Sequence, residues 1–368
     1  MAAPAQIEWI DVGASEQLAR LPVQQIRIGE VRIALTFANG QFGAVSGVCN
    51  HAGGPLGEGH LDGEFLVCPW HQWKFHRCTG HGEPGYEDDR VPQYAVRVQD
   101  GRVQLSARPI SARGRKPHPA HPLERPTDRA PGPIRVAGIS TTNMTAGNPR
   151  YSTSEALLAC ALEHAATSAG VETREIRLRD LGFRACEGYY SRSAKACTWP
   201  CSITQSDPKD ELTIVYDTLV HWADVVIVAT PIRWGAASSL YYKMVERMNC
   251  IQNQITLHDR VLIQRKVASF IVTGGQDNVQ AVVGQQLGFF AELGFLFPPF
   301  PFVAHSLGWA EEDMERNVEY VRNSESLRTG ARELAQRSVA MARELIEPSH
   351  ERGNVPRGGR KAQGKAAR

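Results

Sequence analysis

The sequence predicts a multidomain protein in which a small all-β domain precedes an α/β domain built on a doubly wound parallel sheet. The first indication is the length of 368 residues with 42% hydrophobic and 22% charged side chains, which suffices for two globular domains. The second is a run of short alternating apolar segments, separated by turns, over residues 5–106. The third is the alternation of buried-strand and helical patterns after residue 133, which is typical of a parallel sheet.

The β domain is expected to span residues 1–106 and to be antiparallel. Asn39-Gly40 and Asp100-Gly101 are dipeptides of the kind that join the two strands of a hairpin. The apolar residues around them alternate with polar ones, which predicts strands with one buried face. The expected strands cover residues 23–28, 31–37, 41–45 and 96–105.

Residues 107–132 are expected to form a linker rich in Pro and Arg. Its prolines remove backbone donors, and it has no apolar period that would pack against a domain. A tether of this length spans roughly 30 to 80 Å between the flexible-coil and polyproline limits. The sequence therefore predicts that one domain can move against the other or against a neighbouring subunit.

The α/β domain is expected over residues 133–347, followed by a disordered basic tail at 348–368. In such a sheet the ligands lie at the carboxyl ends of the strands. The expected strands are 134–138, 172–178, 224–230, 267–273 and 295–302, and the expected helices are 154–169, 210–222, 236–249, 278–293 and one or two within 311–346.

Charge and hydropathy exclude several classes of function. The 41 Lys and Arg residues against 39 Asp and Glu give a net charge of +2, which favours neither a nucleic-acid partner nor a polybasic membrane anchor. No apolar stretch approaches the about 20 residues of a membrane-spanning helix. Because the N-terminus lacks a secretory pattern, we expect a cytoplasmic protein whose eight cysteines are thiols or metal ligands.

The strongest chemical signal is a pair of loops that each offer one thiolate and one imidazole. Cys49 and His51 lie in the first loop, and Cys68 and His71 lie in the second. A structural zinc ion takes such a set tetrahedrally, whereas a Rieske cluster takes two Cys on one iron and two His on the other. The four residue types alone leave both centres open.

The residues around these four resemble the Rieske [2Fe-2S] signature. The similarity covers residues 49–56 and 68–75 and extends over the β domain, and it favours the cluster over zinc. The resemblance implies that Cys49, His51, Cys68 and His71 are the iron ligands.

The resemblance also indicates which kind of Rieske centre to expect. High-potential members of the family carry an additional Cys in each loop, and this chain has Gly54 and Trp70 there, so no disulfide is possible. Those members also place hydroxyl donors where this chain has Trp73 and Phe75. A low-potential, ferredoxin-like cluster is therefore expected.

Three loops at the expected carboxyl ends of strands suggest a second cofactor. The loop after the first strand is rich in hydroxyl groups and ends at a helix start around Ser154, which suits a phosphate monoester or simply caps the helix. With residues 229–235 and 273–277, it makes residues 133 to about 345 resemble the flavodoxin-like NAD(P)H-dependent FMN reductase family.

That resemblance implies two groups of flavin contacts. The phosphate contacts are Ser140, Ser152, Thr153 and Ser154, and the further plausible ones in this loop are Thr141, Thr142, Asn143 and Arg150. The ring contacts are Pro231, Ile232, Arg233, Trp234, Gly235, Thr273, Gly274, Gly275 and Gln276. Because no Gly-x-Gly-x-x-Gly fingerprint is present, the nicotinamide of NAD(P)H is expected to stack on FMN directly.

Together these features predict an NAD(P)H-dependent flavin and iron–sulfur oxidoreductase, with a homo-oligomer formed through the flavodoxin-like domain. Electrons pass from NAD(P)H through FMN to the Rieske cluster and on to a partner oxygenase, a carrier or a quinone-like compound. The alternative is a non-catalytic redox sensor or electron carrier with the same two cofactors. A Rieske oxygenase is excluded, since no Asp-x-x-His-x-x-x-His-like segment follows the linker.

Three further cysteines are placed as in the cluster-bearing segment of iron–sulfur flavoproteins. Cys186, Cys197 and Cys201 are more widely spaced than in that family, so a second cluster would need Cys160 or an outside ligand. The simpler expectation is that the three are reduced thiols.

Overall fold

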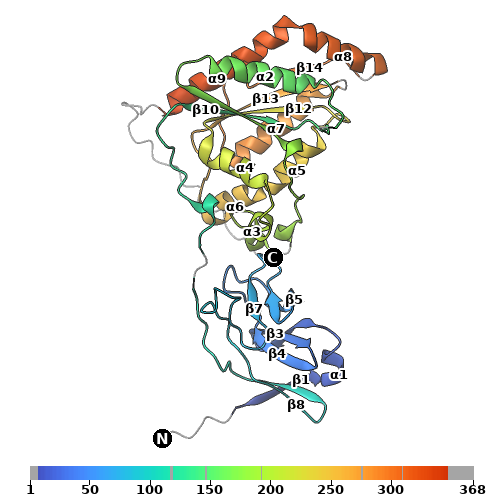
Figure 1. The fold of residues 1–368 in the computed structure, drawn as a ribbon, viewed down its shortest axis with the longest axis vertical. Coiled ribbons are helices and arrows are strands. Elements are labelled where there is room, and N and C mark those ends of the chain that lie inside the picture. The colour runs from blue at the N-terminus through green and yellow to red at the C-terminus, as the bar shows by residue number, and fades with distance from the viewer. Residues whose placement is uncertain are drawn as a thin grey trace, which may run out of the picture.

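A computed structural model describes residues 7–116, 119–145, 147–191, 193–274, 277–308 and 310–346. Figure 1 shows two bodies, with the β domain lying below helices α3 (Ser202–Ser206) and α6 (Asn249–His258) of the larger α/β domain. The predicted fold class is confirmed, whereas the predicted tail at 348–368 lies outside the described residues. None of the helices in the described ranges is both long and apolar enough to cross a membrane.

The β domain consists of three antiparallel three-stranded sheets, with strand orders β1-β9-β8, β2-β3-β4 and β5-β6-β7. The Asn39-Gly40 turn joins β3 to β4 with both residues at positive φ, as a tight hairpin of this type requires. The strands are β1 (Trp9–Ala14), β2 (Val23–Ile28), β3 (Val31–Ala38), β4 (Gln41–Ser46), β5 (His60–Asp62), β6 (Phe65–Val67), β7 (Lys74–His76), β8 (Val96–Gln99) and β9 (Arg102–Ser106).

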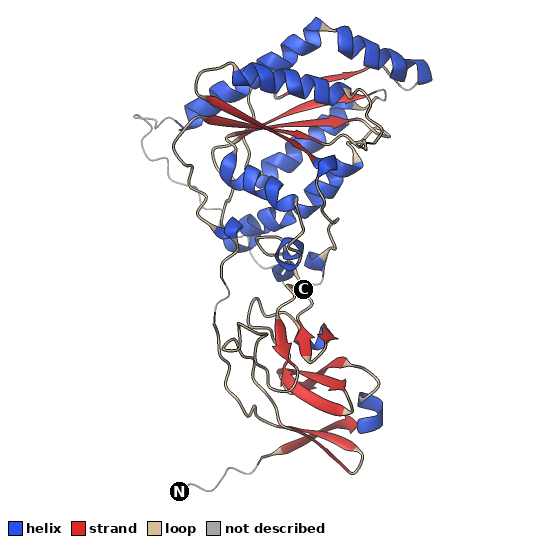
Figure 2. Cartoon of the chain, in the orientation of Figure 1, coloured by secondary structure: helices blue, strands red, loops and turns tan. Residues whose placement is uncertain are grey.

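The α/β domain contains a five-stranded parallel sheet with the order β11-β10-β12-β13-β14. Its strands are β10 (Ile134–Ser140), β11 (Val171–Arg177), β12 (Val225–Pro231), β13 (Val267–Gly274) and β14 (Phe302–Ser306). The central strands β12 and β13 are buried along their whole length because helices cover both faces, as Figure 2 shows.

Each face of the parallel sheet has its own helical layer. One face packs against α2 (Thr153–Ala166), α8 (Glu311–Asn323) and α9 (Glu325–Ile346). The other packs against α4 (Leu212–Asp217), α5 (Ser239–Arg247), α6 and α7 (Val279–Leu293). This second layer lies between the sheet and the β domain (Figure 1).

The last strand lies later in the chain than the sequence pattern predicted. We expected a strand at residues 295–302, but β14 begins at Phe302. Pro298, Pro299 and Pro301 lack the N–H group that a strand donates to its neighbour, so a regular ladder starts only after the last of them.

The predicted linker is held to both domains instead of lacking contacts. At its start, Gly114 pairs with Arg90 of the β domain. Further along, Leu123 is only 3% exposed in the core of the α/β domain, and Arg129 forms an ion pair of 2.8 Å with Asp224. Side chains between the prolines therefore supply the packing that the absence of an apolar period did not suggest.

Candidate functional site

The four predicted iron ligands meet at one end of the β domain. Cys49 follows β4 and Cys68 follows β6, and their side chains are within hydrogen-bond distance of each other and almost fully buried. The rings of His51 and His71 lie next to each other, with centroids 4.4 Å apart. The donors are thus arranged as one pair of thiols and one pair of imidazoles.

This two-plus-two arrangement fits a [2Fe-2S] cluster better than a zinc ion. A Rieske cluster takes two thiolates on one iron and two imidazoles on the other, which matches this pairing of the side chains. Gly54 leaves space next to the sulfur of Cys68. A Cβ atom at this position would lie only 2.7 Å from Cys68 Sγ. Only glycine leaves that position open beside the sulfur of this predicted ligand.

Local electrostatics favour the metal-binding protonation states of Cys68 and His71 but not that of Cys49. The hydrogen bond from Cys49, together with the backbone N–H groups of Trp70 and His71, lowers the pKa of Cys68, while the same thiol contact raises the pKa of Cys49. Burial and the neighbouring His51 lower the pKa of His71 to about 3. Thiolate and neutral imidazole are the protonation states that bind iron.

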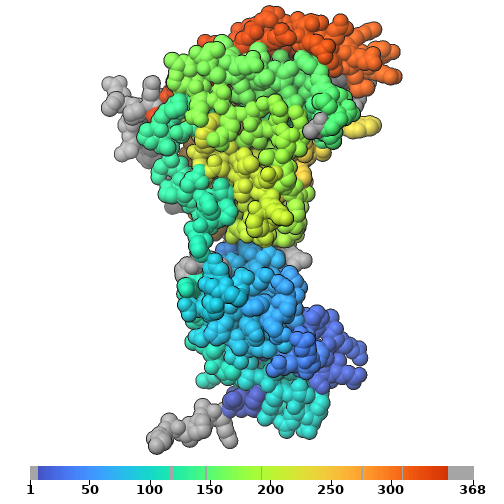
Figure 3. Space-filling view, viewed as in Figure 1, coloured from blue at the N-terminus to red at the C-terminus, as the bar shows by residue number. Residues whose placement is uncertain are grey.

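The two histidines differ in their surroundings. His51 is exposed and stacks on Trp73, with ring centroids 4.6 Å apart and an interplanar angle of 11°. His71 is 4% exposed, and its Nε2 atom lies 3.0 Å from Thr198 Oγ1 of the α/β domain. Ala196 is fully buried in the apolar cluster that contains Cys49 and Cys68. Figure 3 shows the β domain directly against the part of the chain around residue 200.

This contact differs from the arrangement expected from the sequence. The tether expected from the sequence is long enough for the β domain to approach the carboxyl ends of the parallel strands. The β domain instead contacts the segment around Ala196 and Thr198, on the outer side of the α4–α7 layer (Figure 1). No sequence signal pointed to this segment, because the contact joins residues 127 positions apart.

The predicted flavin residues gather around a cavity of about 200 Å³ at the carboxyl ends of β10, β12 and β13. The N-terminus of the 14-residue helix α2 lies here, and its free N–H groups and dipole suit a phosphate. The predicted residues that line this cavity are Thr142, Asn143, Ser152, Thr153, Pro231, Arg233, Thr273 and Gly274.

Hydroxyl groups connect the strands that form this cavity. Thr142 Oγ1 lies 2.9 Å from Ser152 Oγ, and Thr153 Oγ1 lies 2.7 Å from Thr273 Oγ1 on β13. Ser152 also caps α2 by accepting a hydrogen bond from the backbone N–H of Glu155. The loop that the sequence offered either as a phosphate site or as a helix cap therefore caps α2, and its Ser152 also lines the cavity.

Other predicted flavin residues do not line the cavity. Ser140 donates a hydrogen bond of 2.6 Å to Glu155, and Ser154 is fully buried beside Thr142. Ile232 is also fully buried, whereas Trp234 is 88% exposed. Neither Trp234 nor Gly235 contributes to the lining, and both have positive φ. Gly275 and Gln276 lie outside the described residues.

Helix α8 adds lining residues that the sequence reasoning missed. Met314, Asn317 and Val318 face the cavity from this helix, and Tyr151, which was also missed, faces it from the loop before α2. Arg150 of the same loop lines the cavity as the sequence predicted. Asn317 is 1% exposed, and its Oδ1 atom has no hydrogen-bond partner in the part of the chain that the structure describes. A buried asparagine in a strongly charged helix is the signal that could have drawn attention to α8.

The cysteines outside the Rieske domain are not grouped as a second cluster with Cys160 would require. Cys201 lies within hydrogen-bond distance of Cys250, and this thiol, with Arg247 Nε at 3.2 Å, lowers the pKa of Cys201 to about 5. Cys197 lies 3.3 Å from Asn249, and burial raises its pKa to about 11. Cys160 instead contacts the backbone carbonyl of Arg328 in the opposite helical layer. The residue near Cys201 is therefore Cys250, not Cys160.

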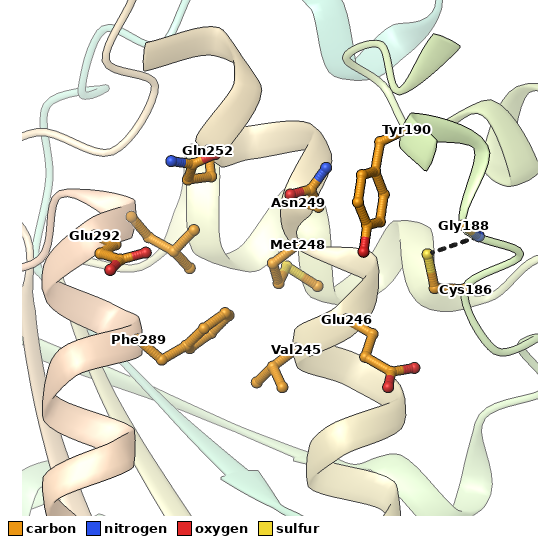
Figure 4. A pocket seen from close by; sticks show the side chains of 11 residues that line it. Cys186, Gly188, Tyr190, Val245, Glu246, Met248, Asn249, Gln252, Phe289 and Glu292 are labelled. Atoms are coloured by element: carbon orange, nitrogen blue, oxygen red, sulfur yellow. Dashed lines mark hydrogen bonds between the residues drawn. The ribbon is translucent and has the colours of Figure 1, made fainter. Parts of the chain in front are cut away.

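A second cavity, of about 480 Å³, lies between α5, α6, α7 and residues 186–190 (Figure 4). Tyr190, Asn249 and Glu246 border it on one side, and Phe289 and Glu292 border it on the other (Figure 4). None of the predicted flavin residues lines it, so the two cavities are separate.

Comparison with known families agrees with this division of the chain. Residues 8–95 match the Rieske [2Fe-2S] domain family, and residues 143–310 match the NADPH-dependent FMN reductase family. The ferredoxin component of the alkene monooxygenase system of Xanthobacter autotrophicus is 32% identical over 112 residues, which cover 29% of this chain and 88% of that protein.

Two further similarities cover different parts of the chain. The ferredoxin component of the naphthalene 1,2-dioxygenase/salicylate 5-hydroxylase systems of Ralstonia sp. is 28% identical over 97 residues, or 26% of this chain and 93% of that protein. The crystal structure of RosB with bound 8-demethyl-8-formylriboflavin-5'-phosphate covers 64% of this chain and 96% of its own, with 17% identity and a TM-score of 0.45.

These matches confirm the two resemblances that the sequence motifs predicted, and with them the cofactors. A Rieske domain implies a [2Fe-2S] cluster, and an FMN reductase domain implies FMN and NAD(P)H. The chain is therefore an electron-transfer oxidoreductase that belongs to the Rieske [2Fe-2S] family in its N-terminal part and to the NADPH-dependent FMN reductase family in its C-terminal part.

Proposed function

We propose that this oxidoreductase carries electrons from NAD(P)H through FMN to its Rieske cluster and then to an acceptor outside the chain. The observation that carries the proposal is that one chain holds both the paired thiols and imidazoles of the Rieske domain and the hydroxyl-lined cavity at the carboxyl ends of β10, β12 and β13. When bound, FMN supplies the conversion of a hydride into single electrons, and the cluster accepts these one at a time.

The residues of the chain have separate tasks in this scheme. Cys49, His51, Cys68 and His71 hold the cluster. The hydroxyl groups of Thr142, Ser152 and Thr153 with the N-terminus of α2 bind the FMN phosphate. The Pro231 to Arg233 loop and Thr273 with Gly274 border the ring, and Asn317 donates or accepts a hydrogen bond at the side of α8. The proposed domain limits remain 1–106, 107–132 and 133–347.

An oxygenase component is the proposed acceptor. Two relatives of the Rieske domain are ferredoxin components of a monooxygenase system and of dioxygenase and hydroxylase systems. His51, which is exposed at the end of the domain, is the ligand available to such a partner.

The compartment we propose is the cytoplasm, in keeping with eight free cysteines.

The arrangement of the two sites favours a homo-oligomer formed through the reductase domain. The flavin cavity lies at the carboxyl ends of the strands beside α8, whereas the Rieske domain lies beyond the α4–α7 layer (Figure 1). In an oligomer the cavity of one copy can face the cluster of the next. Light scattering of the purified protein gives the number of subunits, and a monomer would contradict this part of the proposal.

Anaerobic mixing with NAD(P)H in a stopped-flow spectrometer tests the electron route. We expect the flavin absorbance to bleach first and the cluster absorbance to change afterwards. Steady NAD(P)H oxidation with an added one-electron acceptor, above a free-flavin control, separates the enzyme from the alternative of a redox sensor. A flavin that is reduced beside a cluster that stays oxidised would refute the relay.

A further inference from the structure

The hydroxyl of Thr198 forms a hydrogen bond between the two domains and has two further partners in its own domain. Thr198 Oγ1 lies 3.0 Å from His71 Nε2, 3.2 Å from the carbonyl oxygen of Pro200 and 3.0 Å from Gln205 Nε2. The Pro200 carbonyl only accepts a hydrogen bond, and the Gln205 amide nitrogen only donates one. The single proton of the hydroxyl therefore goes to Pro200, and Oγ1 is free to accept from His71.

This assignment determines which ring nitrogen of His71 carries the proton and which one faces the iron. Since Nε2 is engaged by Thr198, Nδ1 is the nitrogen left for iron. A neutral imidazole bound through Nδ1 carries its proton on Nε2 and donates it to Thr198. Thr198 is thus a hydrogen-bond acceptor for a cluster ligand, although it lies 127 positions away and in the other domain, and the backbone of Ala196 in the same segment is a further hydrogen-bond partner of His71.

The segment that presents Thr198 is fixed to its own domain by several contacts. Asn253 donates hydrogen bonds to the carbonyl oxygens of Ala194 (3.1 Å) and Cys197 (3.0 Å), and Ser202 donates one to that of Ala196 (2.6 Å). Ala196 is fully buried against the Rieske core. The acceptor is therefore held in place by contacts within the reductase domain.

We propose that Thr198 is a positioning residue that couples docking of the Rieske domain to the redox properties of its cluster. An acceptor for the Nε2 proton makes the imidazole a stronger electron donor to iron, which stabilises the oxidised cluster. The docked cluster consequently has a lower midpoint potential than one whose His71 lacks this partner. The inference rests on the ligand role of His71 in the proposed function, but it does not require electrons to come from NAD(P)H.

The test compares Thr198→Val with Thr198→Ser in the full-length protein loaded with its cluster. Valine keeps the shape of threonine without an acceptor, whereas serine keeps the hydroxyl. Ser206→Ala is the matched control, since Ser206 lies in the adjacent helix α3 and donates only to the Ile203 carbonyl. Each variant is titrated with mediators and dithionite while the electron paramagnetic resonance spectrum of the reduced cluster is recorded.

We expect Thr198→Val to shift the midpoint potential to a more positive value and to change the g values of the cluster. Thr198→Ser and Ser206→Ala should match the unsubstituted protein in both readouts. Unchanged potential and g values in Thr198→Val, at normal flavin content, would overturn the inference.

Two further results separate this inference from the proposed function. If His71→Ala retains a Rieske spectrum, the ligand assignment is wrong and the inference is overturned with it. If NAD(P)H never reduces the cluster but Thr198→Val still shifts its potential, the electron route is wrong while the role of Thr198 is supported. The titration needs no NAD(P)H, so the two failures are distinguishable.

Discussion

Arg247 and Asp210 form an ion pair of 2.6 Å in which both side chains are completely buried. The same guanidinium donates to Cys201 Sγ, to the Arg184 carbonyl and to Thr204, so it joins α5 to the segment that contacts the Rieske domain. These partners accept hydrogen bonds from the guanidinium. A buried charge without such partners is strongly unfavourable.

Removing one member of this pair should destabilise the reductase domain. We expect Asp210→Ala to lower its free energy of unfolding by about 3–5 kcal/mol, because Arg247 then remains buried without a counter-charge. Urea denaturation followed by flavin fluorescence measures the loss. Glu325→Gln is the control, since its pair with Arg332 is exposed and should contribute little. Equal effects of the two substitutions would show that the buried pair has no special role.

Cluster and flavin should be lost independently. Cys68→Ser or His71→Ala is expected to abolish the iron–sulfur spectrum and to leave FMN content unchanged, since each domain has its own core. Cys78→Ser is the control, because Cys78 is not among the four proposed ligands. A normal Rieske spectrum in either ligand variant contradicts the assignment.

Arg233→Ala should weaken FMN binding, because Arg233 lines the cavity next to Thr273 and Gly274. A lost hydrogen bond to a charged group is worth about 1.5–3 kcal/mol, or roughly a tenfold to hundredfold change in Kd. Isothermal calorimetry of the apoprotein with FMN measures it, with the exposed Arg260→Ala as control. Unchanged affinity in Arg233→Ala would remove this residue from the site.

Lys266 should make stability depend on pH in the alkaline range. Burial lowers the pKa of Lys266 from 10.5 to about 8, so the folded state binds this proton less well than the unfolded chain. The resulting destabilisation is fully present below pH 8 and disappears as the pH rises toward 10.5.

The size of this effect follows from the shift, at about 1.4 kcal/mol per pKa unit. We expect Lys266→Met to raise the free energy of unfolding at pH 7 by up to about 3 kcal/mol and to remove this part of the pH dependence. Denaturation at pH 7 and pH 10 measures both. A less stable variant at pH 7 would show that the ammonium group has a favourable partner.

The accuracy of the sequence predictions followed the range of the interactions involved. Cys49 to His51 and Cys68 to His71 are local motifs on two turns, so their convergence could be expected from the residues around them. Ser152 was predictable for the same reason, since a helix cap is set within a few residues.

Contacts between distant segments could not be predicted in this way. Asn317 reaches the flavin cavity only because α8 follows β14 at the sheet edge, and neither periodicity nor composition gives that position. Leu123 is one apolar residue among prolines, yet it enters the core of the reductase domain. The start of β14, by contrast, could have been predicted from the sequence. The prolines after Phe297 lack backbone donors, so the strand begins only after them.

The unequal exposure of the two imidazoles gives the cluster an inner and an outer side. His71 is enclosed by the segment of the reductase domain around Thr198, and His51 remains on the surface beside Trp73. A visiting protein that contacts His51 does not compete with Thr198 for His71. In the proposed electron route, an acceptor that contacts His51 therefore takes electrons without separation of the two domains, and the same assembled molecule passes them on repeatedly.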